Sequence, residues 1–310
     1  MHRPPPSLST LVISLALLFE ACGTPRAQES TAPTAAASLA TATTVTPTGA
    51  PTAFPLPSIL PSPEATPSAV AALAHCTGRP SVGTGDSFHA VSTWAGYVAG
   101  EPPGGVSCVE ASWVEPTVTC DDAPAGVDIW VGIGAYDSVD LGIEDKGHPI
   151  QQAGTGVDCE DGLAEHYAWH QYLPRDSEDQ RFRTAGDGGE MVVEPGDRMW
   201  AQVRYGDGAF TMTVANLSTG DVRSVTQSGA GRHRSSAEWI VSGEADEPMA
   251  RFASVMFSGG LVTLGGIVGP VGAASWNRNR IDEWAGDIKR LRVSDLNAAG
   301  DGFRVVWLHR

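Results

Sequence analysis

The chain has 310 residues, of which 42% are hydrophobic, and its 36 acidic residues outnumber its 20 basic residues to give a net charge of -16. That length and apolar content are enough for one large or two small domains with a substantial core. The negative charge repels nucleic acid and anionic lipid, so we expect neither as a partner.

Residues 1–22 have the pattern of an export signal, with a basic start, an apolar run at 11–19 and a small residue, Ala21, before Cys22. The apolar run is too short to span a bilayer as a stable helix. Ala21 before Cys22 resembles a bacterial lipoprotein box, although Phe19 and Glu20 fit that box poorly. We therefore expect a secreted or extracellular protein, either lipid-anchored through Cys22 or cleaved and released.

Residues 23–74 are dominated by Ala, Thr, Pro and Ser and cannot form a core. This composition predicts a semi-extended spacer of roughly 3 Å per residue. A cleaved inhibitory prosegment is the competing interpretation, but the segment lacks the charges and apolar anchors needed to grip a domain. The folded domain is then expected over residues 75–310.

The cysteines favour disulfides over a metal site. Cys22 belongs to the export signal, and removing it leaves an even number for an oxidising compartment, namely Cys76, Cys108, Cys120 and Cys159. Four cysteines allow three pairings, and spacing cannot choose among them. None has the close paired spacing of a zinc site, and we expect no metal and no cofactor.

Beyond residue 75 the chain consists of short alternating runs separated by glycine, proline and aspartate. Strands are predicted at residues 109–114, 127–133, 165–173, 190–194, 199–205, 209–215, 237–241, 252–257 and 303–308. Residues 206–208 read Gly-Asp-Gly, which is a hairpin signal. Without long amphipathic helical periodicity, this pattern predicts an all-β fold, an antiparallel β-sandwich of the jelly-roll kind.

The strand predicted at 237–241 contains one carboxylate in an apolar run. Because strand side chains alternate, Glu238 shares a face with Ile240 and Ser242, and Trp239 lies on the other face. Glutamates are rarely buried without a partner. On these residues alone, a solvated strand face is favoured over a site.

The strand predicted at 165–173 has two different faces. His166 and His170 share one face, but no carboxylate completes a metal site, so a solvated face is the default interpretation. Tyr167, Trp169 and Gln171 share the other face, and they suit a cleft for an extended peptide or a sugar as well as a face packed against a loop.

Trp94 and Trp130 pose the same choice between packing and binding. Residues 151–154, Gln-Gln-Ala-Gly, are interpreted as a polar strand end that meets a glycine turn.

A succession of motifs gives these residues a common meaning. In chain order they are Trp-Ala-Gly-Tyr at 94–97, Ala-Ser-Trp-Val-x-Pro at 111–116, Trp-Val-Gly-Ile at 130–133, Gln-Ala-Gly-Thr at 152–155, Tyr-Ala-Trp at 167–169 and Ser-Ala-Glu-Trp-Ile-Val at 236–241. This succession resembles the glutamic peptidases, or eqolisins, and is most similar to their bacterial branch. The resemblance covers roughly residues 90–257.

The resemblance implies a sandwich of two curved antiparallel sheets with the active site on a concave face. It implies that Gln152 and Glu238 are the catalytic pair and that Trp94, Trp130 and Trp169 line the cleft. Tyr167 and Gln171 are added as further substrate-binding candidates. The resemblance also implies two disulfides, Cys120 with Cys159 and Cys76 with Cys108.

Three departures from the family pattern each remove a carboxylate. Gly134 stands where relatives usually have aspartate, and Gln171 and Ser242 stand where they have glutamate. Since nearby carboxylates raise each other's pKa, we predict that the pKa of Glu238 is lower here than in relatives. Weakened or lost activity is the alternative consequence.

The leading hypothesis is an exported, monomeric endopeptidase that cleaves protein or peptide substrates in acid. Free glutamate titrates near pH 4.3 and can accept a proton from water in mild acid, and a glutamine amide can donate to an oxyanion at any pH. A non-catalytic peptide- or glycan-binding sandwich is the alternative. A glycosidase needs two close carboxylates, and the Glu-x-Asp-x-x-Glu cluster that such sandwiches often use is missing.

Overall fold

The computed structural model describes residues 70–84, 87–92, 94–100, 105–134, 150–173, 175–176, 178–182, 189–229, 234–243 and 248–309. All of them belong to one compact unit, Pro61–Arg310. The predicted export signal with Cys22, and the spacer up to residue 69, lie outside the described residues. In the described ranges no helix has the length and apolar character needed to cross a membrane.

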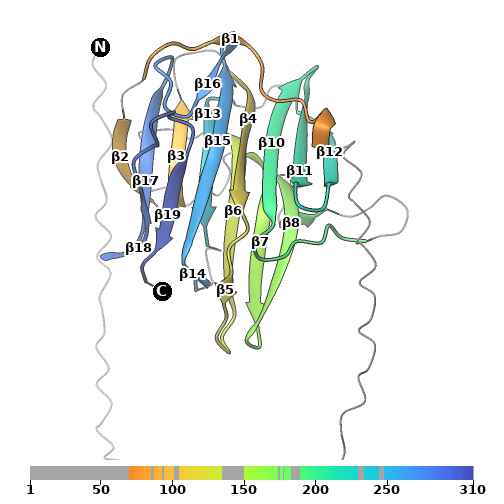
Figure 1. Cartoon of the computed structure of the whole chain (residues 1–310), viewed down its shortest axis with the longest axis vertical. Coiled ribbons are helices and arrows are strands. Elements are labelled where there is room, and N and C mark those ends of the chain that lie inside the picture. Colours follow the sequence, from red (N-terminus) through yellow and green to blue (C-terminus); the bar gives the residue numbers. More distant parts are fainter. Residues whose placement is uncertain are drawn as a thin grey trace, which may run out of the picture. The chain divides into compact units, whose positions relative to one another are not determined.

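The front sheet carries the motif-bearing strands. Its order is β2 (Ser87–Ser92), β17 (Asn277–Ala285), β3 (Trp94–Gly100), β13 (Ser236–Ser242), β6 (Ala125–Gly134), β7 (Gln151–Glu160), β8 (Leu163–Tyr172) and β9 (Gln180–Arg181). All neighbours are antiparallel except β2 and β17, which run parallel. In Figure 1 these strands run roughly along the long axis of the unit.

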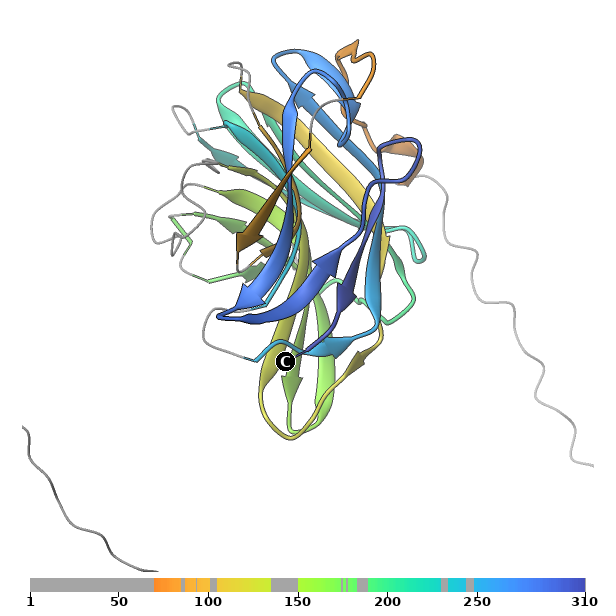
Figure 2. The ribbon, with the colours of Figure 1, turned by 90° about the vertical axis from the view of Figure 1, so that its left-hand side faces the viewer.

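The back sheet has the order β1 (Arg79–Pro80), β16 (Ile267–Pro270), β15 (Ser254–Leu264), β4 (Val106–Val114), β10 (Arg198–Gly206), β11 (Ala209–Asn216) and β12 (Asp221–Ser228). β18 (Ile288–Val293) and β19 (Phe303–Trp307) join the two sheets, because β19 pairs with both β15 and β18 while β18 pairs with β17. Figure 2 looks onto this blue joining region. β5 (Val118–Thr119) and β14 (Arg251–Phe252) form a separate ladder.

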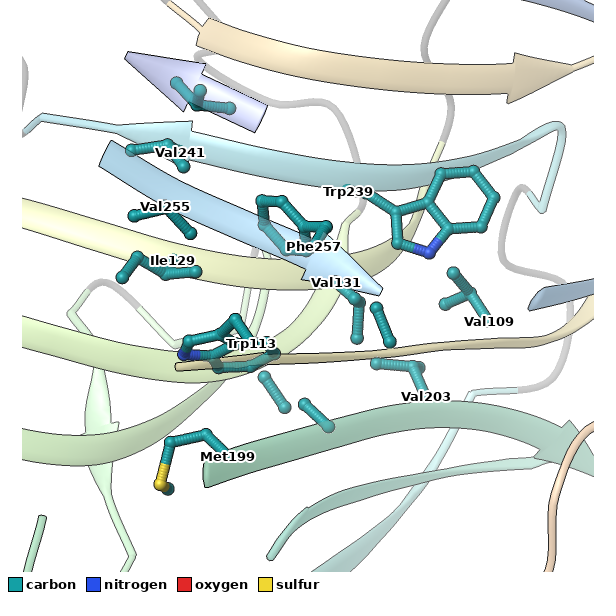
Figure 3. Close-up of a cluster of buried hydrophobic side chains, with 14 of the residues drawn as sticks. Val109, Trp113, Ile129, Val131, Met199, Val203, Trp239, Val241, Val255 and Phe257 are labelled. Atoms are coloured by element: carbon teal, nitrogen blue, oxygen red, sulfur yellow. The ribbon is translucent and has the colours of Figure 1, made fainter. Parts of the chain in front are cut away.

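The main core lies between the two sheets and is built by strand alternation. In Figure 3, Trp239 and Val131 of the front sheet face the same cluster as Phe257 and Trp113 of the back sheet. The rings of Trp113 and Phe257 are tilted at 5.9 Å between centroids. Because all four side chains are buried, their packing holds the front sheet in place from behind.

The all-β sandwich predicted from the sequence is confirmed. Most predicted strands are present, but residues 191–194 form no strand, although they alternate in the sequence. Residues 151 and 152 do form the polar end of a strand, since β7 begins at Gln151, but the predicted glycine turn is wrong because Gly154 lies within that ten-residue strand. The predicted hairpin at 206–208 joins β10 to β11, with the left-handed φ angles of 50° at Asp207 and 74° at Gly208 that such a turn requires.

Residues 74–76 are fixed to the outer face of the back sheet. The amide of Cys76 donates to the buried carboxylate of Glu110 at 2.9 Å, and Gln202 Nε2 donates to the carbonyl of Ala74 at 2.8 Å. A short 3-10 turn, η1 (Val70–Ala72), precedes them. The structure contains the disulfides Cys76–Cys108 and Cys120–Cys159, the pairs that the resemblance implies. Cys76–Cys108 links the segment covalently to β4.

Candidate active site

Glu238 lies at the centre of β13, on the face of the front sheet that is turned away from the main core. Its neighbours Ala237 and Trp239 point into the core, and Ile240 belongs to a second apolar cluster on the face of Glu238. The predicted alternation is therefore correct. The solvated face is not, because Glu238 has no exposed surface. A substrate can reach this carboxylate only after neighbouring groups move.

Gln152 and Glu238 lie in one row across three neighbouring strands. Glu238 of β13 pairs with Gly132 of β6, and Gly132 pairs with Gln152 of β7. Residues paired in register point to the same side of a sheet, and two strand spacings put their backbones roughly 10 Å apart. The row continues to Gln171 of β8. The acid and the amide thus face each other across a position that has no side chain.

Two glycines of β6 make room for the carboxylate. A Cβ atom at Gly132 would lie 2.8 Å from Glu238 Oε2, and one at Gly134 would lie 2.8 Å from Glu238 Oε1. Any side chain there would displace the carboxylate, which consequently leans over β6 towards Gln152. A glycine within a strand often marks a close approach of another group. At Gly132 and Gly134 that group is the carboxylate of Glu238.

Hydrogen bonds hold both members of the pair. The hydroxyl of Ser236 donates to Glu238 Oε1 at 2.5 Å, and both residues are fully buried. Gln152 Nε2 donates to Gln171 Oε1 at 2.6 Å, and these two side chains are 8% and 9% exposed. This bond uses one of the two hydrogens of the Gln152 amide.

The aromatic candidates gather beside this pair. The second apolar cluster contains Trp130, Tyr167 and Trp169, and Trp94 packs against it. Trp94 and Trp130 meet edge to face at 5.2 Å between ring centroids. Trp130 Nε1 donates to the hydroxyl of Ser242 at 3.1 Å, so one of the positions that lack the family carboxylate serves to orient a tryptophan.

Tyr167 is held rigidly at one side of the cluster. Its hydroxyl donates to Asp158 Oδ1 at 2.9 Å, and the Arg181 guanidinium lies 4.2 Å above its ring. Burial, with the charges of Asp128 and Asp158 beside it, raises the pKa of Tyr167 well above its usual value. The hydrogen bond from Arg181 lowers the pKa of Glu165. Tyr167 therefore stays neutral and fixed in position at acidic and neutral pH.

One atom of the pair and one atom of the neighbouring aromatic cluster are buried and have no hydrogen-bond partner in the described part of the chain. They are Gln152 Oε1 and Trp169 Nε1. Leaving a buried donor or acceptor unsatisfied costs about 1 to 3 kcal/mol, so such atoms call for an explanation. Both side chains project from the face of the row, since Trp169 pairs in register with Gly154, two residues along β7 from Gln152. They are positions where a bound molecule can supply the missing partner.

The two histidines of β8 do not lie on a solvated face as expected. His166 Nδ1 lies 2.9 Å from Glu115 Oε1, and this pair is almost completely buried. His170 packs against the edge of Phe182 at 4.7 Å, and burial lowers its pKa. Both point towards the main core because Tyr167 and Trp169 occupy the opposite face of the strand.

Sequence reasoning assigned no role to Ser236 or Gly132. The signal for both was present, because Ser236 lies two residues before Glu238 on a strand and therefore shares its face. Gly132 stands inside a predicted strand, where glycine weakens the strand and needs a reason. Both could have been found by applying the alternation rule to the motif residues.

Comparison with known proteins identifies the family of this chain. The model of the Peptidase A4 family matches residues 92–292. A structure of scytalido-glutamic peptidase with a transition state analog inhibitor has a TM-score of 0.55 and 20% identity, covering 70% of this chain and 98% of that one. A second, with a peptide based transition state analog, has a TM-score of 0.52, 19% identity and the same coverage.

Aspergilloglutamic peptidase from Aspergillus niger is 26% identical over 59% of this chain and 99% of its own, with a TM-score of 0.45. A search of curated protein sequences finds no significant match. The family match covers more than half of the chain and includes all the motifs of the row and of the aromatic cluster. The chain therefore belongs to the Peptidase A4 family, the glutamic peptidases, which are hydrolases that act on peptide bonds.

Proposed function

We propose that this protein is an exported endopeptidase that hydrolyses peptide bonds in acid through Glu238 and Gln152. The observation that carries the proposal is the row in which the two residues face each other across Gly132. The row places a base and a hydrogen-bond donor on the same side of one sheet, and a substrate would have to displace the side chains of Trp130 and Ile150 that now lie over Gly132. No metal or covalent intermediate is needed in this reaction.

In the first step the ionised carboxylate of Glu238 takes a proton from water while the water oxygen bonds to the carbonyl carbon of the substrate. The carbonyl electron pair moves onto oxygen, and Gln152 Nε2 donates a hydrogen bond to the resulting oxyanion. Gln171 accepts one hydrogen of this amide and so fixes the position of Nε2, whose second hydrogen is the one that the oxyanion would accept. The donor is neutral and stays a donor at every pH.

In the second step Glu238, now protonated, gives its proton to the nitrogen of the departing amine. The carbon–nitrogen bond breaks, the oxyanion returns to a carbonyl group, and the products are a carboxylic acid and an amine. Glu238 ends the cycle ionised. The carboxyl must therefore exist in both protonation states near the working pH, which favours acidic conditions for a glutamate.

The aromatic cluster supplies contacts for the substrate. Trp130 and Trp169 offer apolar surface beside the row, and Trp169 Nε1 can donate to a peptide carbonyl. Gln152 Oε1 can accept from the attacking water or from a peptide N–H. These contacts satisfy buried atoms that otherwise have no partner in the described ranges.

The test is digestion of a denatured protein by the purified full chain between pH 2 and 7. We expect Glu238→Gln to reduce the rate by at least about 10³-fold and Gln152→Ala by roughly 10²- to 10³-fold. Ser258→Ala, at an exposed hydroxyl of β15 in the back sheet, is the matched control and should cleave like the unmodified protein. Circular dichroism verifies that each variant is folded.

The outcome also separates the peptidase from a binding module. If the unmodified chain retains a peptide on its aromatic face without cleaving it at any pH, the catalytic proposal is wrong and a peptide-binding sandwich replaces it. The missing carboxylates at Gly134, Gln171 and Ser242 are the reason to include this outcome. Cleavage that persists in Glu238→Gln would place the chemistry elsewhere.

Export is part of the proposal and is supported by the two disulfides, which persist in oxidising compartments. Attachment of lipid to Cys22 follows from the sequence pattern alone, and we expect the full chain to remain with the membrane fraction. Labelling of expressing bacterial cells with a radioactive fatty acid, compared with the Cys22→Ser variant, measures this. Unlabelled protein in the culture medium would indicate simple cleavage and release.

A further inference from the structure

The hydroxyl of Ser236 touches the carboxylate of Glu238 directly. Its Oγ lies 2.5 Å from Glu238 Oε1, and neither residue has exposed surface. A carboxylate accepts but does not donate, so the hydroxyl is the donor. Hydrogen bonds of this charge-assisted type are short and about twice as strong as neutral ones.

The two oxygens of Glu238 occupy different surroundings. Oε1 lies 2.8 Å from the Cβ position of Gly134, and Gly134 pairs with Ser236. Oε2 lies 2.8 Å from the Cβ position of Gly132, the residue that pairs with Gln152. Oε2 also lies 3.3 Å from the Cβ position of Gly134, so it sits between the two glycines, while only Oε1 accepts from Ser236.

We infer that Ser236 is a positioning residue that holds Oε1 and leaves Oε2 as the oxygen that takes the proton from water and returns it to the amine. This inference rests on the proposed function. Rotation of the carboxylate about its terminal bond would exchange the two oxygens, and the hydroxyl donor opposes that rotation. The same donor favours the ionised carboxylate, which lets Glu238 act as a base at a lower pH.

Replacing Ser236 leaves the other charged residues near Glu238 unchanged. On the two strands that flank β13, the described charged residue on this face is Asp128 of β6, in register with Ser242. The residues of β3 carry no charge, and Gln152 and Gln171 are neutral. Asp158 of β7 and Glu165 of β8 lie further away beside Arg181, and Glu283 lies near the end of β17 beside Arg290. None of them changes when Ser236 is replaced.

The test compares Ser236→Ala and Ser236→Thr in the full chain by measuring kcat and KM on a denatured protein substrate across the pH range. We expect Ser236→Ala to lower kcat roughly 10- to 100-fold with little change in KM, and to move the acid limb of the profile up by about one pH unit. Ser236→Thr keeps the donor and should restore most of kcat and the original limb. Ser224→Ala, at a hydroxyl on β12 of the back sheet, is the control.

The outcomes distinguish this inference from the proposed function. If Glu238→Gln is inactive but Ser236→Ala has the original kcat and pH profile, the role of Ser236 is wrong and the proposed function stands. If Glu238→Gln remains active, the proposed function itself fails. Should Ser236→Ala not fold, Ser236→Cys keeps the shape with a weaker donor, and an unmoved acid limb in that variant overturns the inference.

Discussion

A buried glutamate lies against each face of the front sheet: Glu238 comes from the front sheet itself, and Glu115 directly follows the end of β4 in the back sheet. Glu115, next to the main core, accepts from Thr155 Oγ1 at 2.7 Å and from Trp113 Nε1 at 3.4 Å on Oε2, while His166 contacts Oε1 at 2.9 Å. Its partners come from β4, β7 and β8. Glu238, on the opposite face, has its carboxylate above two glycines of a neighbouring strand.

This difference helps to distinguish a buried carboxylate that stabilises the fold from one that is placed for catalysis. Glu115 joins three strands, and removing it would leave several buried polar groups unsatisfied. The carboxylate of Glu238 occupies the space above two glycines of the adjacent strand, and its hydrogen-bond donor Ser236 belongs to its own strand. The first arrangement favours stability and the second favours chemistry.

The largest effects are expected when each of these two glutamates is replaced in turn. Glu115→Ala removes the buried acceptor of Thr155, Trp113 and His166 and should lower the free energy of unfolding by about 3 to 5 kcal/mol, since each unsatisfied buried group costs about 1 to 3 kcal/mol. Glu238→Gln should change it by less than about 1 kcal/mol while abolishing cleavage. Urea unfolding with intact disulfides measures both. A small stability loss in Glu115→Ala would remove the distinction between the two faces.

A third buried glutamate, Glu283, sharpens the comparison because it has one cation beside it. Arg290 Nη1 lies 3.2 Å from Glu283 Oε1, but burial outweighs this charge and raises the pKa of Glu283 to about 7. A carboxyl whose pKa is raised on folding stabilises the protein fully below the unfolded pKa and loses that contribution as pH rises towards the folded pKa. Stability should therefore fall by about 3 kcal/mol between pH 4 and 8.

The variant Glu283→Gln fixes the neutral state and should flatten this part of the stability curve. Its unfolding free energy at pH 4 should match that of the unmodified chain, and the gain should appear at pH 8. Unfolding by urea at the two pH values is sufficient. If stability depends on pH in the same way in both proteins, the pKa of Glu283 is not raised on folding and the prediction is wrong.

Filling the space above β6 tests the face of Glu238 directly. In Gly134→Ala the new Cβ would lie 2.8 Å from Glu238 Oε1 and 3.0 Å from Ile150 Cγ1, so the flexible carboxylate must move. We expect kcat to fall roughly 10- to 30-fold, in keeping with a lost alignment of the base. Gly134→Asp adds a charge at the same place and should also raise the acid limb. If the pH–rate profiles of the two variants are the same, the effect is steric and the added charge has no influence.

The smallest effect is expected at Gln171. A glutamate there can still accept from Gln152 Nε2, but it adds a charge two strands from Gly132. We expect Gln171→Glu to keep most of kcat and to raise the acid limb by up to about one pH unit, since like charges disfavour ionisation. Gln171→Leu, which removes the acceptor without adding charge, should lower kcat and leave the limb in place.

Much of the fold and the pair could be predicted from the sequence because both follow from local rules. Alternation in β13 correctly separated Glu238 from Trp239, and the order of the motifs brought Gln152 into the account. The two disulfides correspond to the pairs implied by the resemblance. These features depend on residues close in the sequence or on motifs that are read one after another.

What failed depended on contacts between distant segments. Residues 191–194 alternate like a strand but find no partner strand, and Gly154 looked like a turn until β6 and β8 paired on both sides of it. The burial of His166 required knowing that Glu115, which lies 51 positions away, meets it between the sheets. Strand partners and ion pairs of this range are set by the whole fold.

The attachment of residues 74–76 also determines how the protein responds to a mechanical pull. The Cys76–Cys108 bond joins this segment to β4 in the back sheet, while Glu238 and Gln152 lie on the outer face of the front sheet. Tension that enters through the chain before residue 76 passes along a covalent path into β4. A pull on the preceding residues would therefore reach β4 of the back sheet before it reached the strands that carry Glu238 and Gln152.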